Sequence, residues 1–209
     1  MNATPRSNVL HGTVVLTGFA ALAALIVAGM WQLTAERIEA NRMAARLAEF
    51  TEVLGEIDFD EINVDEPQSV SPPHTLPGEE AITYFPVYKD GQLRAWVFTV
   101  NAKGYNGPIE LMIGIDTRAR ITGVRVIAHT ETPGLGDDIE VRKSDWITRF
   151  NTLDYQGDAD SRWALKRDGG DFDAFTGASI TPRGVVNAVA QTLRWVSRHE
   201  EALEAGEVP

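Results

Sequence analysis

Hydrophobic and polar positions are distributed differently in the first 35 residues than in the rest of the chain. Residues 7–35 contain no Asp, Glu, Lys or Arg, and the apolar stretch VVLTGFAALAALIVAGMW runs from Val14 to Trp31. Roughly 20 helical residues cross a bilayer core of about 30 Å. The stretch is longer than the roughly 7–15 apolar residues of a cleaved signal peptide. It therefore predicts an uncleaved transmembrane helix that anchors the chain near its N-terminus.

The pattern changes after the anchor, where apolar residues recur at spacings of three to five among Glu and Arg. This periodicity predicts an amphipathic helix that can continue the anchor. Its apolar residues are Ile38, Met43, Leu47, Phe50 and Leu54. Residues 58–80 are acidic and rich in proline, which predicts an extended connection. We therefore expect three parts: an N-terminal tip and anchor over 1–35, a helix and Pro-rich connection over 36–80, and one folded domain over 81–209.

Alternation of Ile, Val and other apolar residues with a period of two predicts β-strands in the folded domain. The segments 82–88 and 92–100 flank Asp90-Gly91, a dipeptide typical of a two-residue hairpin turn. Two further strands are expected over 109–115 and 121–128.

The remaining segments predict helices and one more turn. Residues 139–150 have a partly helical pattern. The apolar face of that segment comprises Trp146, Ile147 and Phe150. Gly169-Gly170 predicts another hairpin. Residues 182–204 predict a final helix whose apolar positions fall mostly on one stripe. Those positions are Val185, Val186, Val189, Leu193, Val196 and Leu203. The order of elements predicts an α+β fold, with an antiparallel sheet flanked by helices.

Charge and composition exclude several functions. The 209 residues carry a formal net charge of −11, which argues against nucleic acid as a partner. Arg6 is the only charged side chain before Glu36, so 18 of the 19 basic and all 30 acidic residues follow and give that part a net charge of −12. The absence of cysteine excludes disulfides, thiolate zinc sites, Cys-ligated iron–sulfur clusters and a cysteine nucleophile. P-loop, GxSxG, HExxH and GxGxxG patterns are also absent, so no independent catalytic constellation is predicted.

The segment DAFTGASITP, residues 173–182, precedes the last predicted helix. Thr181 followed by Pro182 is typical of an N-cap and a proline at the first helical position. Thr176 and Ser179 add hydroxyl groups near the start of the helix. Because the first N–H groups and the dipole of a helix attract anions, a phosphate could bind here. A capped helix without a ligand is the alternative.

The segment HTETPGLGDDIE, residues 129–140, follows a predicted strand. Its glycines permit unusual backbone angles and the close approach of a ligand. Glu131 and Thr132 supply polar groups, and Leu135 could pack on a planar ring if the turn holds it exposed. The alternative is an ordinary connection between a strand and a helix.

Titratable residues in the same segment do not predict a metal site. No other histidine stands at a ligand-like spacing from His129, which is therefore expected to be a hydrogen-bonded or solvated residue at a strand end. Asp137, Asp138 and Glu140 are expected to form a solvated acidic loop, and weak binding of a cation is the alternative.

Together these segments resemble a known family. The anchor, GYNGPIELMIGID over 104–116, HTETPGLGDDIE and DAFTGASITP occur in this order. They resemble the G subunit of the Rnf ion-translocating electron transport complex, a membrane-anchored protein with covalently held FMN, and the match covers nearly the whole chain. The attachment pattern of that family is Asp-x-x-Ser/Thr-Gly-Ala-Thr/Ser, and it reads DAFTGAS over 173–179 here.

The resemblance implies an FMN whose phosphate is esterified to the last hydroxyl of the motif, Ser179. Most relatives have threonine there, and serine is equivalent as an alcohol; Thr181, two residues further on, is the alternative acceptor. A dedicated flavin transferase would make the bond from FAD with the assistance of Mg²⁺. Asp173, together with Thr176, Gly177 and Ala178, would be the sequence that the transferase recognises.

The resemblance also implies where the flavin ring lies and what it does. Glu131, Thr132 and Leu135 would contact the ring or the ribityl chain, and Tyr105 would line the site. The protein would relay electrons through FMN, as part of redox-driven ion translocation between ferredoxin and NAD, with the other membrane subunits of the complex as partners. One alternative is the C subunit of a sodium-translocating NADH:quinone reductase, which is typically longer. An anchored binding or scaffold module without redox activity is the alternative of another class.

The implied topology places the N-terminus in the cytoplasm and the flavin domain in the periplasm, at the inner membrane. Counting Arg37, Arg42 and Arg46 against Arg6 favours the opposite orientation by the positive-inside rule. Long domains, however, are translocated largely regardless of their charge. We therefore expect the topology of the family.

Overall fold

The computed structural model describes the backbone of residues 5–62, 66–78 and 80–207, and the side chains of these residues except 5–11 and 36–46. Helix α1, Pro5–Leu54, contains both the predicted anchor and the predicted amphipathic helix, which are therefore continuous. The side chains of Ile38 and Met43 lie outside the described residues.

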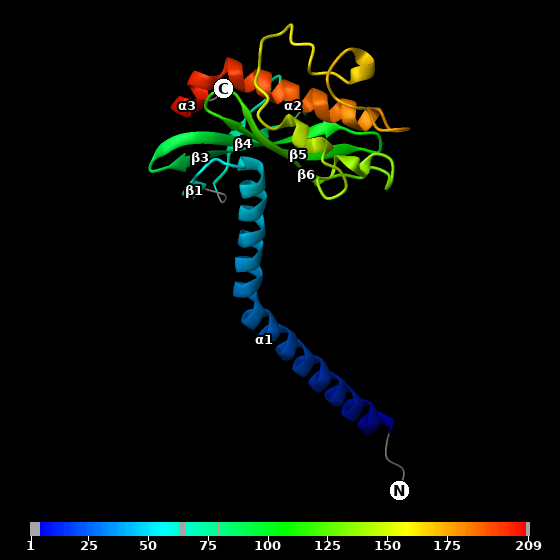
Figure 1. The fold of residues 1–209 in the computed structure, drawn as a ribbon. Coiled ribbons are helices and arrows are strands. Elements are labelled where there is room, and N and C mark those ends of the chain that lie inside the picture. Colours follow the sequence, from blue (N-terminus) through cyan, green and yellow to red (C-terminus); the bar gives the residue numbers. More distant parts are fainter. Residues whose placement is uncertain (1–4, 63–65, 79, 208–209) are drawn as a thin grey trace. The chain divides into compact units, whose positions relative to one another are not determined.

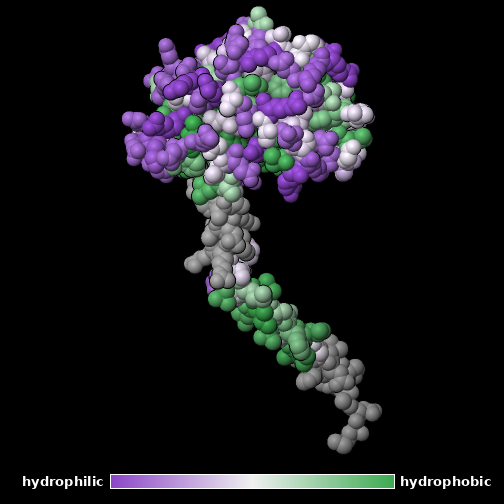
Figure 2. Space-filling view, viewed as in Figure 1, coloured by the Kyte–Doolittle hydropathy of each residue, from purple (hydrophilic) through white to green (hydrophobic). Residues whose placement is uncertain are grey.

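The segment Gly12–Ala35 of α1, 24 residues, is long and apolar enough to cross a membrane, with a mean hydropathy of 2.2 over an 18-residue window. Its apolar side chains are exposed, and Figure 2 shows them gathered along the helix. An exposed apolar helix of this length is stable in lipid, where its backbone is satisfied internally and its side chains need no protein partner.

Contacts divide the chain into two units, Met1–Ala48 and Glu49–Pro209. The last turns of α1, from Glu49 onward, therefore belong to the same unit as the sheet. Hydrophilic side chains predominate on the visible face of that unit in Figure 2.

The second unit is built on an antiparallel sheet with the order β1-β3-β4-β5-β6, in which β2 also pairs with β3 (Figure 1). The strands are β1 Glu61–Ile62, β2 Gln68–Val70, β3 Ile82–Lys89, β4 Gln92–Lys103, β5 Pro108–Asp116 and β6 Ile121–Ala128. All four predicted strands are confirmed. The two shortest strands lie within the segment 58–80, which was expected to be an extended connection only.

The turn between β3 and β4 is the predicted Asp90-Gly91 hairpin. Both residues have positive φ, 51° at Asp90 and 70° at Gly91. A two-residue turn with positive φ at both positions matches the right-handed twist of the flanking strands, and Asp-Gly adopts it at low cost. The register of the long central hairpin is therefore encoded locally.

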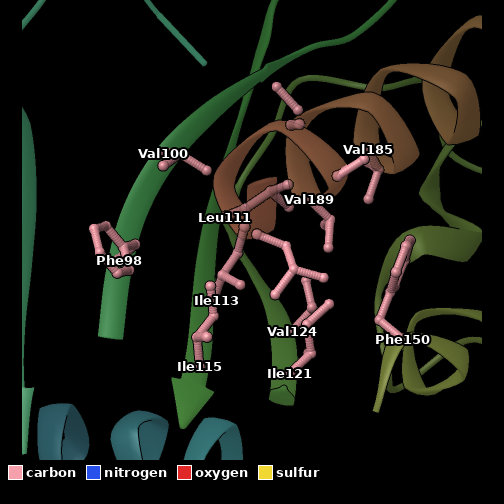
Figure 3. Packing of buried hydrophobic residues seen from close by; sticks show 14 of the residues in the cluster. Phe98, Val100, Leu111, Ile113, Ile115, Ile121, Val124, Phe150, Val185 and Val189 are labelled. Carbon is pink, nitrogen blue, oxygen red and sulfur yellow. The ribbon is translucent and has the colours of Figure 1, made fainter. Parts of the chain in front are cut away.

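Helix α2, Ile180–Arg198, covers one face of the sheet and forms the larger core with it (Figure 1). Figure 3 shows Val185 and Val189 of α2 directed toward Leu111 and Ile113 of β5 and Val124 of β6. Apolar positions of α2 recur at spacings of three and four, so they share the side of the helix that meets the strands.

The opposite face of the sheet is covered by the C-terminal end of α1. Phe50, Val53 and Leu54 form a second core cluster with sheet residues that include Val97 and Met112. Successive strand residues point to opposite faces, so Met112 joins this cluster while its neighbours in β5 join the first. Burial on both faces explains why β5 is an almost continuous apolar run.

A pair of facing glycines allows α1 to approach the sheet closely. Gly114 of β5 pairs with Gly123 of β6, and a Cβ at Gly123 would lie 2.6 Å from the carbonyl oxygen of Val53. The Thr122 hydroxyl donates to that oxygen over 2.8 Å. The end of α1 is thus fixed on the sheet by backbone contact as well as by apolar packing.

The C-terminal region differs from prediction in two places. The single helix expected over 182–204 is divided into α2 and α3, Glu200–Ala205, with His199 between them. Helix α2 begins at Ile180, so its N-cap is Ser179 and not Thr181. Thr181 lies in the first turn, fully buried, because its hydroxyl is used in a long-range hydrogen bond described below.

The hairpin predicted at Gly169-Gly170 is wrong. This segment contains the 3₁₀ helix η3, Lys166–Asp168, and a single parallel bridge between Leu165 and Phe172. Gly169 ends η3 in the left-handed region, with φ 93°. A Cβ at Gly170 would lie 2.2 Å from the Ala164 carbonyl oxygen, so this glycine is required for close chain approach instead of for a strand turn.

The partly helical pattern over 139–150 is confirmed. Two 3₁₀ helices lie in this region, η1 Asp137–Ile139 and η2 Trp146–Phe150. The three apolar residues of η2 that formed the predicted face are all buried.

Candidate functional site

Three loops at one end of the sheet enclose a cavity of about 200 Å³. One loop joins β4 to β5, the second follows β6, and the third precedes α2. The cavity is lined by Tyr105, Glu131, Thr132, Leu135, Gly136, Gly177, Ala178, Ser179, Ile180 and Thr181. Eight of these ten residues were predicted for the site from the sequence, and Gly136 and Ile180 were not named.

Glu131 connects two of these loops to the first turn of α2. Its side chain is only 6% exposed, and its Oε1 atom accepts hydrogen bonds from the backbone N–H groups of Tyr105 and Asn106 over 2.9 and 3.0 Å. Its Oε2 atom accepts a hydrogen bond from the hydroxyl of Thr181. A buried carboxylate is stable only when it is hydrogen-bonded, and these three donors provide that. Glu131 therefore holds the β4–β5 loop and α2 against its own loop.

Two glycines make room for this carboxylate. A Cβ at Gly136 would lie 2.7 Å from Glu131 Oε2 and 2.9 Å from Thr181 Oγ1, and a Cβ at Gly104 would lie 2.5 Å from Glu131 Oε1. The sequence signal for them was the Gly-rich pattern of each loop, which indicates a close approach without identifying its partner.

Leu135 is exposed by the turn that contains it, which is the condition under which it could pack on a planar ring. The N–H groups of Leu135 and Gly136 both donate to the Thr132 carbonyl, and Gly134 has a φ of 78°. Leu135 is 46% exposed at the rim of the cavity, together with Ile180 at 46% and Tyr105 at 69%. Three large apolar or aromatic side chains thus leave much of their surface open to solvent around a cavity that contains hydroxyl groups. An apolar rim of this kind suits a ligand that has a flat ring and a polar tail.

His129 is hydrogen-bonded, as expected. Its Nδ1 atom accepts from the Glu131 N–H over 3.1 Å, and its Nε2 atom lies 3.1 Å from Glu140 Oε1. Among the residues that the structure describes, no group of three or more His, Asp or Glu side chains could hold a metal ion.

The acidic loop over 137–140 is not simply solvated, which corrects the prediction. Asp137 is buried and accepts from Lys143 Nζ over 2.5 Å and from the Gly134 N–H over 2.7 Å. Glu140 lies 2.9 Å from the same Lys143 Nζ. The hydrogen bond from Lys143 lowers the pKa of Asp137. Hydrogen bonds with Lys143 and, to a smaller extent, with His129 lower the pKa of Glu140 to about 2. The sequence did not indicate this ion-pair cluster, because Lys143 follows the loop and no local pattern pairs it with the carboxylates.

The Lys143 cluster predicts how stability depends on pH. The pKa of Glu140 is depressed in the folded protein from an ordinary 4.5 to about 2, so its contribution is present above pH 4.5 and is lost as the pH falls toward 2. Replacing Lys143 with methionine should therefore lower the melting temperature at neutral pH, and the difference from the wild type should shrink below pH 4.5. Thermal unfolding in detergent, followed by tryptophan fluorescence at several pH values, measures this.

Arg142→Met is the matched control. Arg142 contacts the other oxygen of Glu140, but its side chain is 86% exposed, and such pairs contribute little. If Lys143→Met and Arg142→Met behaved alike, or if the Lys143→Met difference did not shrink as the pH falls from 4.5 toward 2, the assignment would be wrong.

Only the last part of the attachment motif, residues 177–179, lines the cavity. Ser179 is partly buried, and its Oγ atom accepts a hydrogen bond from Arg167 over 2.6 Å. Thr176 is exposed and Asp173 lies outside the lining of the cavity. The carboxylate of Asp173 lies between Lys166 Nζ at 2.7 Å and Arg149 Nη1 at 2.5 Å, which lower its pKa.

Comparison with known proteins identifies the class to which this fold and site belong. Residues 104–194 match the family model of an FMN-binding domain, and residues 1–53 match that of the RnfG N-terminal region. The first match contains every residue that lines the cavity, and the second contains the apolar helix Gly12–Ala35. The chain is therefore a membrane-anchored protein with an FMN-binding domain.

Curated relatives narrow this class to one family. The G subunit of the ion-translocating oxidoreductase complex of Pseudomonas aeruginosa (strain UCBPP-PA14) is 37% identical over 208 residues, which cover 99% of this chain and 97% of the relative. The protein of the same name from Shewanella amazonensis is 37% identical over 201 residues, 93% of this chain and 91% of the relative. The chain belongs to the RnfG family, the G subunits of ion-translocating oxidoreductase complexes, and the resemblance noted from its motifs is confirmed.

Identity is higher in part of the chain. The corresponding G subunit of Pectobacterium atrosepticum is 61% identical over 89 residues, 43% of each protein. Among solved structures, a crystal structure of Shewanella oneidensis NqrC matches with a TM-score of 0.49 and 26% identity, over 71% of this chain and 75% of that one.

Proposed function

We propose that this protein relays electrons through an FMN covalently bound to Ser179, within a membrane complex that couples electron transfer between ferredoxin and NAD to ion transport. The proposal rests on the cavity. Residues of the segments 129–140 and 173–182 line it together, Ser179 among them, and all of them lie inside the FMN-binding domain. When bound, FMN accepts and releases electrons singly or in pairs, and the protein supplies its position and surroundings.

The residues present fit this cofactor. Ser179 lines the cavity at the N-cap of α2, where the first N–H groups of the helix favour an anion such as a phosphate. Leu135, Ile180 and Tyr105 offer apolar surface for a ring, and Glu131 and Thr132 offer polar atoms. A cavity of about 200 Å³ is smaller than the roughly 300–1,000 Å³ that encloses a drug-sized ligand, so part of the flavin would remain accessible to an electron-transfer partner.

Burial favours Ser179 over Thr181 as the acceptor. Thr181 is fully buried, and its hydroxyl already donates to Glu131. Esterification there would break this hydrogen bond and place a phosphate in the core, whereas Ser179 is only partly buried and lines the cavity. The Ser179 assignment therefore requires the smaller rearrangement.

Attachment would be made by a flavin transferase that uses FAD and Mg²⁺. Ser179 Oγ would form a bond to the phosphorus of the FMN half of FAD, the bond from that phosphorus to the AMP oxygen would break, and AMP would leave with the electron pair. The hydroxyl proton would pass to a base of the transferase. Asp173 and the segment 176–178 would be read by the transferase, which is supported by the exposure of Thr176 and Gly177.

The proposed location is the inner membrane, with the N-terminus in the cytoplasm and the FMN domain in the periplasm. The proposed covalent attachment is consistent with this topology, because a cofactor lost outside the cytoplasm cannot be recovered. The proposed partners are the other membrane subunits of the complex.

Removal of residues 1–35 tests whether the domain carries the site by itself. Co-expressed with a flavin transferase and exported, the shortened protein should be soluble and yield a fluorescent band on a denaturing gel, because α1 residues Phe50, Val53 and Leu54 remain to cover the sheet. Full-length protein in detergent is the control. A dark band with an unmodified mass for both proteins would remove the basis of the redox function and leave an anchored module without flavin. An aggregated product from the shortened chain alone would show that the domain is not self-contained.

A further inference from the structure

The loop before the attachment motif presents one arginine to the acceptor hydroxyl. Arg167 lies in η3, and its Nη1 atom donates to Ser179 Oγ over 2.6 Å. The position of η3 is fixed, because the Lys166 N–H donates to the Phe172 carbonyl over 2.7 Å and the Gly170 N–H to the Leu165 carbonyl over 3.1 Å. The residues between Arg167 and Ser179 therefore form a loop that brings these two side chains into contact.

The basic side chains near Arg167 form ion pairs with carboxylates. Lys166 and Arg149 contact Asp173 at 2.7 and 2.5 Å, and Arg183 contacts Asp168 at 2.6 Å. Arg167, by contrast, has its nearest carboxylate oxygen, on Asp168, at 3.9 Å. Among these four cations, Arg167 is the one whose short contact is with a neutral hydroxyl.

A guanidinium that donates to an alcohol gains less than one that donates to an anion. Its planar set of donors matches two oxygens of a phosphate, and it remains charged at every physiological pH. Arg167 is therefore oriented toward the position where esterification of Ser179 would introduce a negative charge.

We propose that Arg167 binds the phosphate of the FMN attached to Ser179, which rests on the proposed function. The phosphodiester carries one negative charge on two oxygens bonded to the same phosphorus as Ser179 Oγ, within reach of the Arg167 donors. The same contact stabilises the charge on these oxygens while the bond to Oγ forms and the bond to AMP breaks, so Arg167 also accelerates attachment.

The test uses full-length protein in detergent, purified flavin transferase, FAD and Mg²⁺. Wild type, Arg167→Gln, Arg167→Lys and Arg183→Gln are compared. Arg183→Gln is the matched control, because it removes the same charge close to the start of α2 from a side chain that contacts Asp168 and not Ser179. The readouts are the initial rate of flavin incorporation, by in-gel fluorescence and intact mass, and the ³¹P chemical shift of the flavinylated product.

Arg167→Gln should slow incorporation roughly tenfold to a hundredfold, the range expected for losing a hydrogen bond to a charged group. It should also move the ³¹P resonance, with Arg167→Lys intermediate and Arg183→Gln within about twofold of the wild-type rate. Arg167 is 58% exposed, so its replacement leaves the core intact.

Three results would overturn the inference. Wild-type incorporation rates in Arg167→Gln would do so while leaving the proposed function in place. Slower incorporation with an unchanged ³¹P shift would assign Arg167 to contact with the transferase instead of the phosphate. A wild-type protein that takes up no flavin would reject the proposed function and this inference together.

Discussion

Replacing Ser179 with alanine should remove all covalently bound flavin from the protein. The alanine side chain has no oxygen to esterify, and the neighbouring hydroxyl that could substitute, on Thr181, is fully buried and donates to Glu131. Full-length protein co-expressed with the transferase should therefore give a dark band on a denaturing gel and an unmodified intact mass. The fold should be retained, because Ser179 makes no side-chain cap hydrogen bond in α2.

Two companion variants make the result specific. Ser179→Thr should keep the flavin, because it restores an alcohol at the same position. Thr181→Val should keep most of it, since valine preserves the shape of the buried side chain while removing its hydroxyl. Peptide mass mapping that located flavin on Thr181 in the wild type, or a fluorescent Ser179→Ala band, would contradict the assignment.

Glu131→Ala should have the second largest effect, on both stability and flavin content. The substitution leaves the N–H groups of Tyr105 and Asn106 and the hydroxyl of Thr181 without their acceptor. An unsatisfied buried donor costs about 1–3 kcal/mol, and water can reach the loop donors, so we expect a loss of about 2–4 kcal/mol. Denaturant unfolding in detergent and flavin incorporation by the transferase measure the two effects.

Glu131→Gln separates the hydrogen bonds from the charge. The amide oxygen can accept from both N–H groups, and the amide nitrogen can donate to Thr181 Oγ1, so this variant should stay within about 1 kcal/mol of wild type. Wild-type stability in Glu131→Ala would show that the two loops and α2 are held together by other contacts. Equal losses in both variants would show that the charge, and not the hydrogen bonding, is what matters.

The effect of Glu131 could not be predicted from the sequence, although the residue itself was selected. The family resemblance assigns it to contact with the flavin ring or the ribityl chain, which stays a prediction. Its hydrogen bonds join residues 25, 26 and 50 positions apart, to Asn106, Tyr105 and Thr181. Contacts over such separations depend on the register of β4, β5 and β6 and on the packing of α2, which no local pattern contains.

The change of N-cap has the same origin. Thr181-Pro182 has the local signature of a helix start, and the sequence placed the cap there. In the folded protein the Thr181 hydroxyl donates to Glu131, so α2 begins at Ile180 and Ser179 takes the N-cap position beside the cavity. A tertiary hydrogen bond in a buried site outweighed a local capping preference.

By itself the sequence determined the anchor, the four long strands, the Asp90-Gly91 turn and the two segments that meet at the cavity. Each depends on burial or backbone conformation that repeats over a few residues, and such periodicity is written directly into the order of side chains. Only the tertiary structure decided that Glu131 joins two loops to α2, that Lys143 pairs with Asp137 and Glu140 and that Arg167 contacts Ser179. These pairings follow from where the sheet and α2 bring distant loops together, because a charged or polar side chain finds its partner through space and not along the chain.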